Sequence, residues 1–401
     1  MRARLLWALL ALACAPAAAL AAFDPSDVIQ IQPSATLEHD SNLFRLPDDA
    51  GPRPGIDPSK RSDTIRTLGL GLTFDKLISR QRIVADLNLF ERTYDKNTNL
   101  DFVGGEGHLS WLWQVGSHWS GEARYRKRRT LGGFADVQLN IRDIIDTEGL
   151  LLRGGYGFHP RWRIGGELTK QEVTHSASLR QNLDSESDGV AVTLTHRTPA
   201  RNTVGLQARW VERHYPNRVS TGVFTADNRH TERRLNAVAV WNFTEALKLD
   251  AELGHTDVTH DRLAQRDFAG VTWSAAATWE ATAKIRVNLD TSKDVRLYEN
   301  IASSYVVVKR VSLSPIYAVT SKVSVQGTLT FEKRDYRGDP GFVIGIPQRE
   351  NKFRVARIGV SYAPIRNVDL FVSYEQGDLN SSNPLASYDY HSVSGTVRLS
   401  F

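Results

Sequence analysis

From residue 28 to the C-terminus, short segments of the chain alternate between apolar and polar residues, the pattern of β-strands with two unlike faces. Segments 244–255 and 284–297 are clear examples. In the second, Ile285, Val287 and Leu289 fall on one face, and charged or polar residues stand between them. Alternation alone does not distinguish a membrane barrel from a soluble β-sandwich, because the polar face of a sandwich strand also meets water.

The connections between these segments alternate in length. We expect eighteen strands, centred near residues 34, 69, 87, 109, 125, 151, 167, 192, 208, 238, 250, 273, 290, 309, 328, 357, 372 and 395. Short turns such as 116–118 and 157–160 alternate with longer polar connections such as 40–63 and 298–303. Short periplasmic turns and longer external loops produce this sorting, for which a sandwich has no reason. The sequence therefore predicts an all-β protein, a transmembrane antiparallel up-and-down β-barrel of about eighteen strands.

Aromatic residues agree with a barrel. Several tryptophans lie close to the expected short turns, as an interfacial girdle would: Trp111, Trp113, Trp119, Trp162, Trp241 and Trp279. The alternative is tryptophans in the core of a large soluble β-domain. The chain ends on Phe401, with Leu399 and Val397 on the same face of the last strand. A terminal aromatic residue on such a strand is similar to the signal that the barrel assembly machinery recognises.

The N-terminus carries an export signal. Arg2 and Arg4 precede the apolar run 5–12, and small residues lead to an A-x-A site at 19–21. A buried N-terminal helix would need a polar face, which this segment lacks. We expect a signal peptide at 1–21 and an outer-membrane barrel at 22–401. The single cysteine, Cys14, falls in the signal, so the mature chain has no disulfide and no thiolate ligand.

Bulk composition alone suggests a soluble protein. The mean hydropathy is −0.34, 24% of residues are charged, and no run after the signal is apolar enough for a membrane helix. In a barrel, however, every lipid-facing residue alternates with a lumen-facing one, so average hydropathy misleads. A barrel of 16–18 strands encloses an aqueous channel unless a segment fills it. The long first connection, 40–63, is rich in proline and aspartate. We expect it to be an ordinary external loop, and the alternative is that it folds inward.

If the apolar residues face lipid, the alternating ones line the lumen. Arginines dominate this set and define a candidate basic wall: Arg124, Arg126, Arg128, Arg161, Arg163, Arg209, Arg213, Arg286, Arg296, Arg310 and Arg334. Carboxylates also face inward, and we expect about half of the lumen charges to pair across strands. Because guanidinium groups suit carboxylates and phosphates, and the net charge is +5, we expect an anionic or weakly acidic permeant.

Catalysis is not expected. The histidines are dispersed without a metal-binding spacing, and neither a G-x-S-x-G elbow nor a glycine-rich phosphate loop is present. We therefore expect no catalytic, cofactor-binding or metal site and no cofactor. Aromatic residues offer another possible use of the lumen, because their faces stack on sugars. The candidates for such a path are Phe90, Tyr94, Phe134, Tyr215, Phe224, Tyr298, Tyr336, Phe353 and Phe371.

Four short segments resemble a known family. They are 40–47 (DSNLFRLP), 79–82 (SRQR), 266–270 (RDFAG) and 333–338 (KRDYRG). In this order they are similar to the exosortase-associated exopolysaccharide-biosynthesis outer-membrane β-barrels, the L component of eps loci, within a broader β-barrel porin family. The resemblance implies a barrel that passes polysaccharide across the outer membrane. It supplies no established site residue.

Three hypotheses about function follow. The first is an exit pore for exopolysaccharide, the second a general or small-solute porin, and the third a structural or adhesive scaffold. The longest connection follows the first strand instead of standing mid-chain, where porins usually place an inward loop, and this mildly favours the exit pore. The expected partners are outer-membrane lipid, polysaccharide, the barrel assembly machinery and periplasmic export components, but no nucleic acid.

Overall fold

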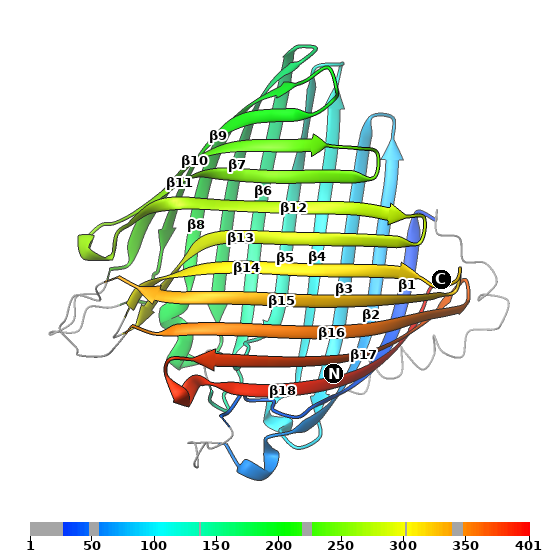
Figure 1. Cartoon of the computed structure of the whole chain (residues 1–401), viewed down its shortest axis with the longest axis vertical. Coiled ribbons are helices and arrows are strands. Elements are labelled where there is room, and N and C mark those ends of the chain that lie inside the picture. Colours follow the sequence, from blue (N-terminus) through cyan, green and yellow to red (C-terminus); the bar gives the residue numbers. More distant parts are fainter. Residues whose placement is uncertain (1–26, 48–55, 136–137, 219–226, 301–302, 339–347) are drawn as a thin grey trace.

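A single closed sheet makes up the protein. The structure, a computed structural model, describes residues 27–47, 56–135, 138–218, 227–300, 303–338 and 348–401, so the expected signal peptide lies outside the described residues. Eighteen antiparallel strands pair in chain order, and β1 also pairs with β18, which closes the barrel (Figure 1). Closure leaves no free sheet edge, so every strand has hydrogen-bonded neighbours on both sides. The predicted antiparallel barrel of eighteen strands is confirmed.

The strands are β1 (Ile29–Asp40), β2 (Asp63–Ile78), β3 (Gln81–Tyr94), β4 (Phe102–Val115), β5 (Trp119–Leu131), β6 (Ile144–His159), β7 (Trp162–His175), β8 (Ser185–Arg197), β9 (Thr203–His214), β10 (Arg229–Asn242), β11 (Leu247–His260), β12 (Phe268–Thr282), β13 (Ile285–Asn300), β14 (Ser303–Ala318), β15 (Val323–Arg337), β16 (Glu350–Ile365), β17 (Val368–Ser381) and β18 (Tyr388–Leu399). Each predicted strand centre falls inside the corresponding strand. Short 3-10 helices stand in the connections: η1 (Pro58–Lys60), η2 (Thr98–Leu100), η3 (Ser178–Leu183), η4 (Ala264–Arg266) and η5 (Pro384–Ala386). Among the described residues, no helix is long and apolar enough to cross a bilayer.

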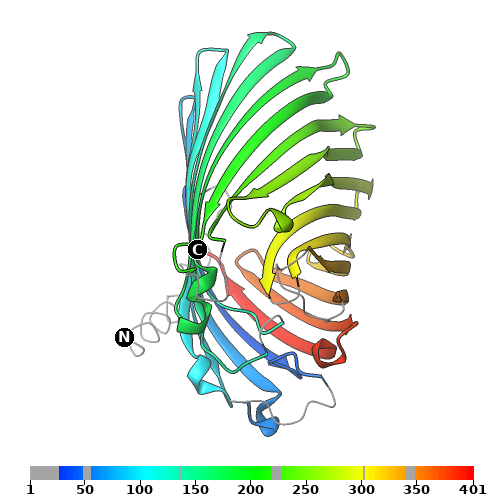
Figure 2. The ribbon, with the colours of Figure 1, turned by 90° about the vertical axis from the view of Figure 1, so that its left-hand side faces the viewer.

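The two ends of the barrel differ in their connections, as Figures 1 and 2 show. At the short-turn end, tight turns use left-handed backbone at Ser79, Gly116 and Arg201 (φ 57°, 61° and 62°). The long-loop end carries the 3-10 helices. One expected long connection, 298–303, is wrong, because β13 continues to Asn300 and β14 begins at Ser303. The polar residues of this segment belong to the two strands and lengthen the hairpin, and do not form a separate loop.

The barrel has an inverted distribution of polarity. The registers place cross-strand partners on one face, and following them from strand to strand gives one consistent outer face. This face is apolar: Leu253, Phe331 and Val372 are 57%, 53% and 59% exposed. The expected girdle tryptophans Trp111, Trp113, Trp119, Trp162, Trp241 and Trp279 all project from it near the short turns. Such an apolar outer band is the surface that a transmembrane barrel presents to lipid.

Candidate functional site

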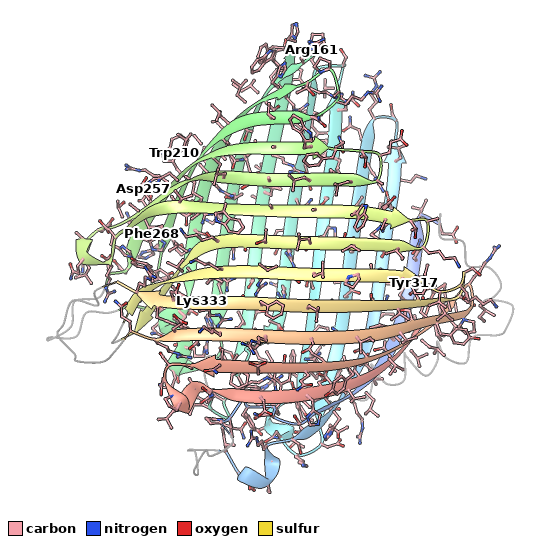
Figure 3. The ribbon with its side chains drawn as sticks, in the orientation of Figure 1. Arg161, Trp210, Asp257, Phe268, Tyr317 and Lys333 are labelled. Atoms are coloured by element: carbon pink, nitrogen blue, oxygen red, sulfur yellow. The ribbon has the colours of Figure 1, made fainter. Side chains whose placement is uncertain are left out.

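The inner face of the barrel is the candidate site. Of the predicted basic wall, these residues stand at inward positions of their strands: Arg124, Arg126, Arg128, Arg163, Arg209, Arg213, Arg286, Arg296, Arg310 and Arg334. Arg161 does not, because β6 ends at His159 and β7 begins at Trp162, which leaves Arg161 in the exposed turn between them (Figure 3). Strand alternation thus placed the inward residues, and the one exception is an error at a strand end.

The sequence did not indicate every inward arginine, and two of those it left out stand on β6 and β10. Arg153 on β6 faces Glu122 of β5, and Arg234 on β10 faces Arg209 of β9. Arg153 directly follows three leucines, Leu150–Leu152, which hide the alternation of β6. Arg234 follows Arg233, and two adjacent arginines leave the inward one undetermined by sequence alone. We use the name basic wall for the inward arginines of β5–β10: Arg124, Arg126, Arg128, Arg153, Arg163, Arg209, Arg213 and Arg234.

A groove runs along the basic wall. Its volume is about 670 Å³, and the arginines at positions 124, 126, 128, 209, 213 and 234 line it together with one carboxylate, Glu232. Gly149, which has no side chain, also lines the groove. Thr147, Thr169 and Ser187 add hydroxyl groups to the lining. Guanidinium forks beside hydroxyl donors form a surface that binds carboxylate and phosphate groups.

Carboxylates accompany the basic wall but are outnumbered. Glu106 forms ion pairs with both Arg126 and Arg128, and Glu122 with both Arg124 and Arg153. The Glu122 side chain is only 2% exposed under its two arginines. Because one carboxylate is shared by two guanidinium groups, pairing leaves an excess of positive charge on this wall.

A matching cluster stands on the far side of the barrel. Glu332 on β15 is fully buried between Arg310 and Arg334, with an Arg334 Nε to Glu332 distance of 2.5 Å. In a closed ring of eighteen strands, β5 and β14 are nine strands apart and so lie opposite each other. Two opposite walls of the lumen therefore each contain a buried carboxylate that forms ion pairs with two arginines.

Two members of the basic wall have no carboxylate partner among the described residues. Arg163 instead donates to the backbone oxygen and the hydroxyl of Ser120, at 3.0 and 2.7 Å. Arg213 has a buried Nε without a hydrogen-bond partner in the described part of the chain. No carboxylate of the described residues therefore neutralises the positive charge of these two guanidinium groups, which adds to the positive potential of the lumen.

The neighbouring wall is acidic. We use the name acidic wall for Asp250 and Glu252 on β11 with Asp290 and Asp294 on β13, which all face inward. A second groove, of about 660 Å³, is lined by the first three of these and Arg310. Glu252 and Asp290 are exposed and form no ion pair within the described ranges.

One ion pair joins the two walls. Arg234 reaches Asp294 over the inner faces of β11 and β12, with 3.0 Å between guanidinium nitrogen and carboxylate oxygen. The inward residues beneath this bridge, Gly254 and Thr272, are small enough to leave it room. The middle of the lumen is therefore divided around its circumference into a positive and a negative sector, and the inward cations Lys248, Arg286 and Arg296 stand at the ends of the negative one.

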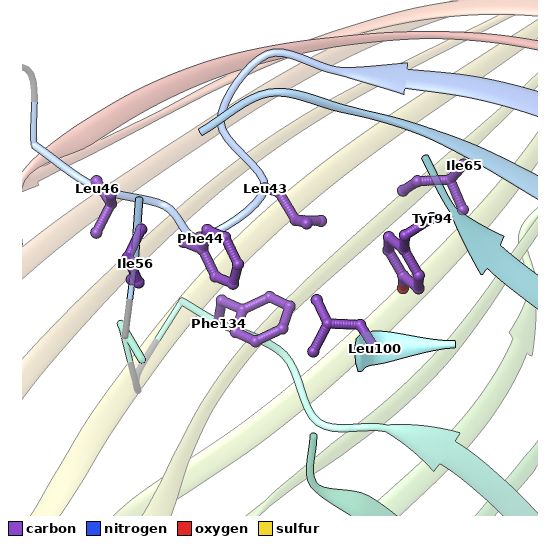
Figure 4. Packing of buried hydrophobic residues seen from close by; sticks show 8 residues of the cluster. All are labelled: Leu43, Phe44, Leu46, Ile56, Ile65, Tyr94, Leu100 and Phe134. Carbon is purple, nitrogen blue, oxygen red and sulfur yellow. The ribbon is translucent and has the colours of Figure 1, made fainter. Parts of the chain in front are cut away.

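The mouth at the long-loop end is partly filled by the connection between β1 and β2. Phe44 is fully buried and packs edge-to-face on Phe134 of the β5–β6 connection, with ring centroids 4.9 Å apart (Figure 4). Ile65 and Tyr94, which face inward on β2 and β3, join the same cluster, as does Leu100. Residues 41–47 thus lie inside the barrel rim, unlike the external loop expected from the sequence.

Polar contacts fasten this segment. Asn42 donates from its amide to the backbone oxygens of Leu46 and Asp389, both at 2.8 Å. The Arg45 guanidinium lies 3.7 Å from the ring centroid of Tyr390, an inward residue of β18, and forms two hydrogen bonds with Asp40. Burial opposes the charge of Arg45, but the Asp40 carboxylate outweighs it and raises the pKa of Arg45.

The connection between β5 and β6 folds inward too. Ala135 packs against Leu379, Tyr388 and Tyr390, which face inward on β17 and β18. Gln138 donates to the backbone oxygen of Arg45 at 2.6 Å. Two connections therefore meet inside the mouth and take up part of its cross-section.

The expected aromatic path for sugars is not continuous. Phe90, Phe353 and Phe371 face inward, but Tyr94, Phe134, Tyr215 and Tyr336 are buried in rim packing. The Arg218 guanidinium covers the Tyr215 ring at 3.3 Å from its centroid. Phe224 and the side chain of Tyr298 lie outside the described residues. The buried rings have no free face on which a sugar could stack.

Metal ligands do not gather in the described part of the chain: no three histidine, cysteine, aspartate or glutamate side chains come together as an ion would require. The last strand ends at Leu399, with Val397 and Leu399 on the outer face, and the Phe401 backbone pairs with Ile31 of β1. Recognition of these terminal residues by assembly machinery stays a prediction.

The fold is that of outer-membrane porins. The chain is similar to the porin OccK2 (OpdF) of Pseudomonas aeruginosa, with a TM-score of 0.51 at 11% identity over 93% of this chain and 98% of that one. OccK2 solved in complex with glucuronate gives 0.50 at 10% identity, again over 93% and 98% of the two chains. A BenF-like porin of Pseudomonas fluorescens gives 0.48 at 8% identity over 93% and 99%. At these identities the likeness concerns the fold alone.

At the sequence level, the family described as "Putative beta-barrel porin 2" matches residues 211–401, from the end of β9 to the C-terminus. Comparison with curated protein sequences found no significant match. The match covers the acidic wall and the second buried carboxylate, whereas most of the basic wall precedes it.

Proposed function

We propose that the protein is a channel of the outer membrane for small solutes, with a preference for anions. The observation that carries this proposal is the groove of six arginines and one carboxylate inside a closed eighteen-stranded barrel. Rings and rows of arginine in a water-filled pore lower the energy of a passing anion and raise that of a cation. The apolar outer band supports the membrane location.

The mouth favours a small permeant over a polymer. The inward-folded connections, joined at Phe44 and Phe134, occupy space that a polysaccharide chain would need. This replaces the preference for an exit pore that we drew from the position of the longest connection, because two connections now narrow the mouth. The complex of OccK2 with glucuronate, a carboxylate-bearing sugar, also supports a small anionic solute for a barrel of this fold.

Polysaccharide export and a scaffold role stay competing hypotheses. The first is supported by the resemblance of segments 40–47, 79–82, 266–270 and 333–338 to exopolysaccharide-associated barrels. The second is supported by no specific contact. Neither requires a lumen that sorts ions by charge, so ion selectivity separates them from the proposed channel.

The direct test is electrical. The refolded barrel is inserted into a planar lipid bilayer, and the reversal potential is measured across a tenfold gradient of potassium chloride. We expect open channels with chloride more permeant than potassium. Cation selectivity, or a barrel that inserts but does not conduct, would refute the proposal.

A deletion strain separates the rivals in the cell. The proposed channel predicts slower uptake of small carboxylates with surface polysaccharide unchanged. Loss of surface polysaccharide, with synthesis intact inside the cell, would instead support the exit pore. Normal uptake and normal polysaccharide together with weaker adhesion would support the scaffold.

A further inference from the structure

Four lysines form a row across the outer face of the barrel. In the strand registers, Lys293 of β13 pairs with Lys309 of β14, Lys309 with Lys333 of β15, and Lys333 with Lys352 of β16. We call these four residues the lysine row. Like charges directly opposite each other on neighbouring strands destabilise a sheet, so the row has an energetic cost.

Other outward-facing cations follow the opposite rule. Five of them pair in the register with a carboxylate on the next strand: Lys127 with Glu148, Arg129 with Asp146, Lys170 with Asp188, Arg233 with Asp257 and Arg354 with Asp378. Others, such as Arg66 and Arg229, face uncharged residues or a histidine and not a second lysine or arginine. Among the described residues, β13–β16 is where cation faces cation along a whole row. Chance scattering of surface charge therefore accounts poorly for it.

The protein itself neutralises only one side of the row. Lys333 forms ion pairs with Asp335 and Glu350, at 3.3 and 2.8 Å, and Lys352 one with Glu350 at 3.2 Å. Lys293 and Lys309 form no ion pair within the described residues. Four ammonium groups thus share two carboxylates, one of which also pairs with Arg337 at 3.8 Å, so at least two positive charges stay uncompensated on the outer surface.

On β13 and β14 the next outward residues beyond the row, Val295 and Val307, are buried, so the row lies at the long-loop limit of the exposed apolar band. The next outward residues toward the short turns include Val311 and Phe331, which are 43% and 53% exposed. Figure 3 shows Lys333 near the long-loop end of the barrel and Tyr317 near the short-turn end. If the apolar band spans the hydrocarbon layer, the lysine row stands at the height of the lipid headgroups on the long-loop side.

We propose that the lysine row binds the headgroup of a lipid that carries two or more phosphates, in the leaflet on the long-loop side. The row covers three inter-strand spacings, about 14 Å, which exceeds the reach of a single phosphate. A broad headgroup with separated phosphates matches both its length and its two uncompensated charges, while the acyl chains lie on Val311 and Phe331 below. The inference rests on the proposed membrane location and not on the ion preference of the channel.

Native mass spectrometry of the folded barrel in detergent tests this proposal, with diphosphoryl lipid A as the probe. We expect at least one lipid A to bind, and the double variant Lys309→Gln, Lys333→Gln to bind it about tenfold more weakly. The same lipid without its phosphates should bind the wild type no better than the variant. Equal binding of lipid A by wild type and variant, or equal binding of the phosphate-free lipid, would overturn the proposal.

Two matched variants control for general charge effects. Lys127→Gln removes an outward lysine that is paired with Glu148, and Glu172→Gln removes an outward charge from β7, opposite β16 in the ring. Neither should change lipid A binding by more than about twofold. Heat-dependent gel migration shows that each variant is folded. Lys309→Gln relieves repulsion between like charges, whereas Lys333→Gln also removes the ion pairs with Asp335 and Glu350, so the two effects offset and the double variant should be about as heat-stable as wild type in lipid-free detergent. If Lys127→Gln weakened binding as much as the double variant, the lysine row would not be the site.

If the single-phosphate lipid phosphatidylglycerol bound as tightly as lipid A, the demand for two phosphates would be refuted. A wild type that conducts with anion preference but binds no lipid A would leave the proposed function intact and refute the lysine row alone. A barrel without conductance that still binds lipid A through Lys309 and Lys333 would do the reverse.

Discussion

The basic wall on β5–β10 and the acidic wall on β11–β13 are built in the same way and carry opposite charge. In both, every second residue of antiparallel strands points to water, and cross-strand pairs hold the side chains at fixed spacing. They differ in stoichiometry. On the basic wall one carboxylate such as Glu106 or Glu122 serves two arginines, whereas Glu252 and Asp290 on the acidic wall have no cation of their own.

This difference shows that the charge of a lumen is a local property of strand register. The net charge of +5 belongs to the whole chain, including the lysine row outside and the arginines of the expected signal peptide. A solute in the lumen meets two sectors of opposite sign, joined by the Arg234–Asp294 bridge. The orientation of a polar solute should therefore matter as much as its charge.

Reversing the basic wall should have the largest effect. In the double variant Arg126→Glu, Arg213→Glu, the basic wall loses four units of positive charge and becomes about neutral, so the acidic wall dominates the lumen and we expect the channel to change from anion to cation preference. The permeability ratio of chloride to potassium should fall roughly tenfold or more. Reversal potentials in planar bilayers measure it. Lys127→Glu, on the same strand but facing outward, is the control, and a comparable change there would contradict a lumenal origin.

Neutralising the acidic wall should have a smaller effect of opposite sign. With Asp250→Asn and Asp290→Asn, the negative sector loses half of its four carboxylates, and we expect chloride preference to rise about threefold. Asp257→Asn on β11, which faces outward, should leave the ratio unchanged. An unchanged ratio in the double variant would mean that ions pass along the basic wall alone.

Removing one shared carboxylate should sharpen the comparison further. Glu106→Gln frees Arg126 and Arg128 from their common partner, so we expect about a twofold rise in chloride preference. The Glu106 side chain is 42% exposed, so its loss should not prevent folding. Glu148→Gln on the outer face is the matched control. A fall in chloride preference would show that Glu106 positions the arginines instead of screening them.

Salt should reduce the contrast between the walls. The screening length falls from about 10 Å at 0.1 M salt to about 3 Å at 1 M, less than the width of the lumen sectors. Wild type and all lumen variants should then converge to within about twofold in permeability ratio. The same tenfold gradient, measured at low and at high mean salt, tests this. Persistence of the full difference at 1 M would indicate direct ion contact with the arginines.

The barrel itself was predictable because its signal is local. The alternation in segments such as 284–297 depends only on residues close together in the sequence. Each predicted strand centre lies in a strand. Strand ends were less predictable, as Arg161 and the 298–303 connection show. Outside the membrane, polar residues occur both in strands that extend a hairpin and in the loops that follow them, so they do not mark where a strand ends. The inward fold of 41–47 had no local signal, because Phe44 is buried by Phe134 from a distant connection.

The candidate site followed the same division. Alternation gave the inward direction of Arg124, Arg126 and Arg128, but the leucine run before Arg153 and the adjacent pair Arg233 and Arg234 hid two members. Which carboxylate serves which arginine depends on register between strands, and no sequence pattern gives it. The partition into two sectors therefore became visible only once the pairings were known.

The contacts of Asn42 and Arg45 in the mouth also constrain the order of folding. Asn42 and its acceptor Asp389 are 347 residues apart in the chain, and Tyr390 stands on the last strand. These bonds can form only after β18 has been synthesised, inserted and paired with β1. The chain between the two strands is then already closed into a loop, and the entropy lost on closing it has to be offset before the bonds contribute. The inner mouth is thus the last part of the molecule to mature, and a half-assembled barrel would be a wider and less selective hole than the finished one.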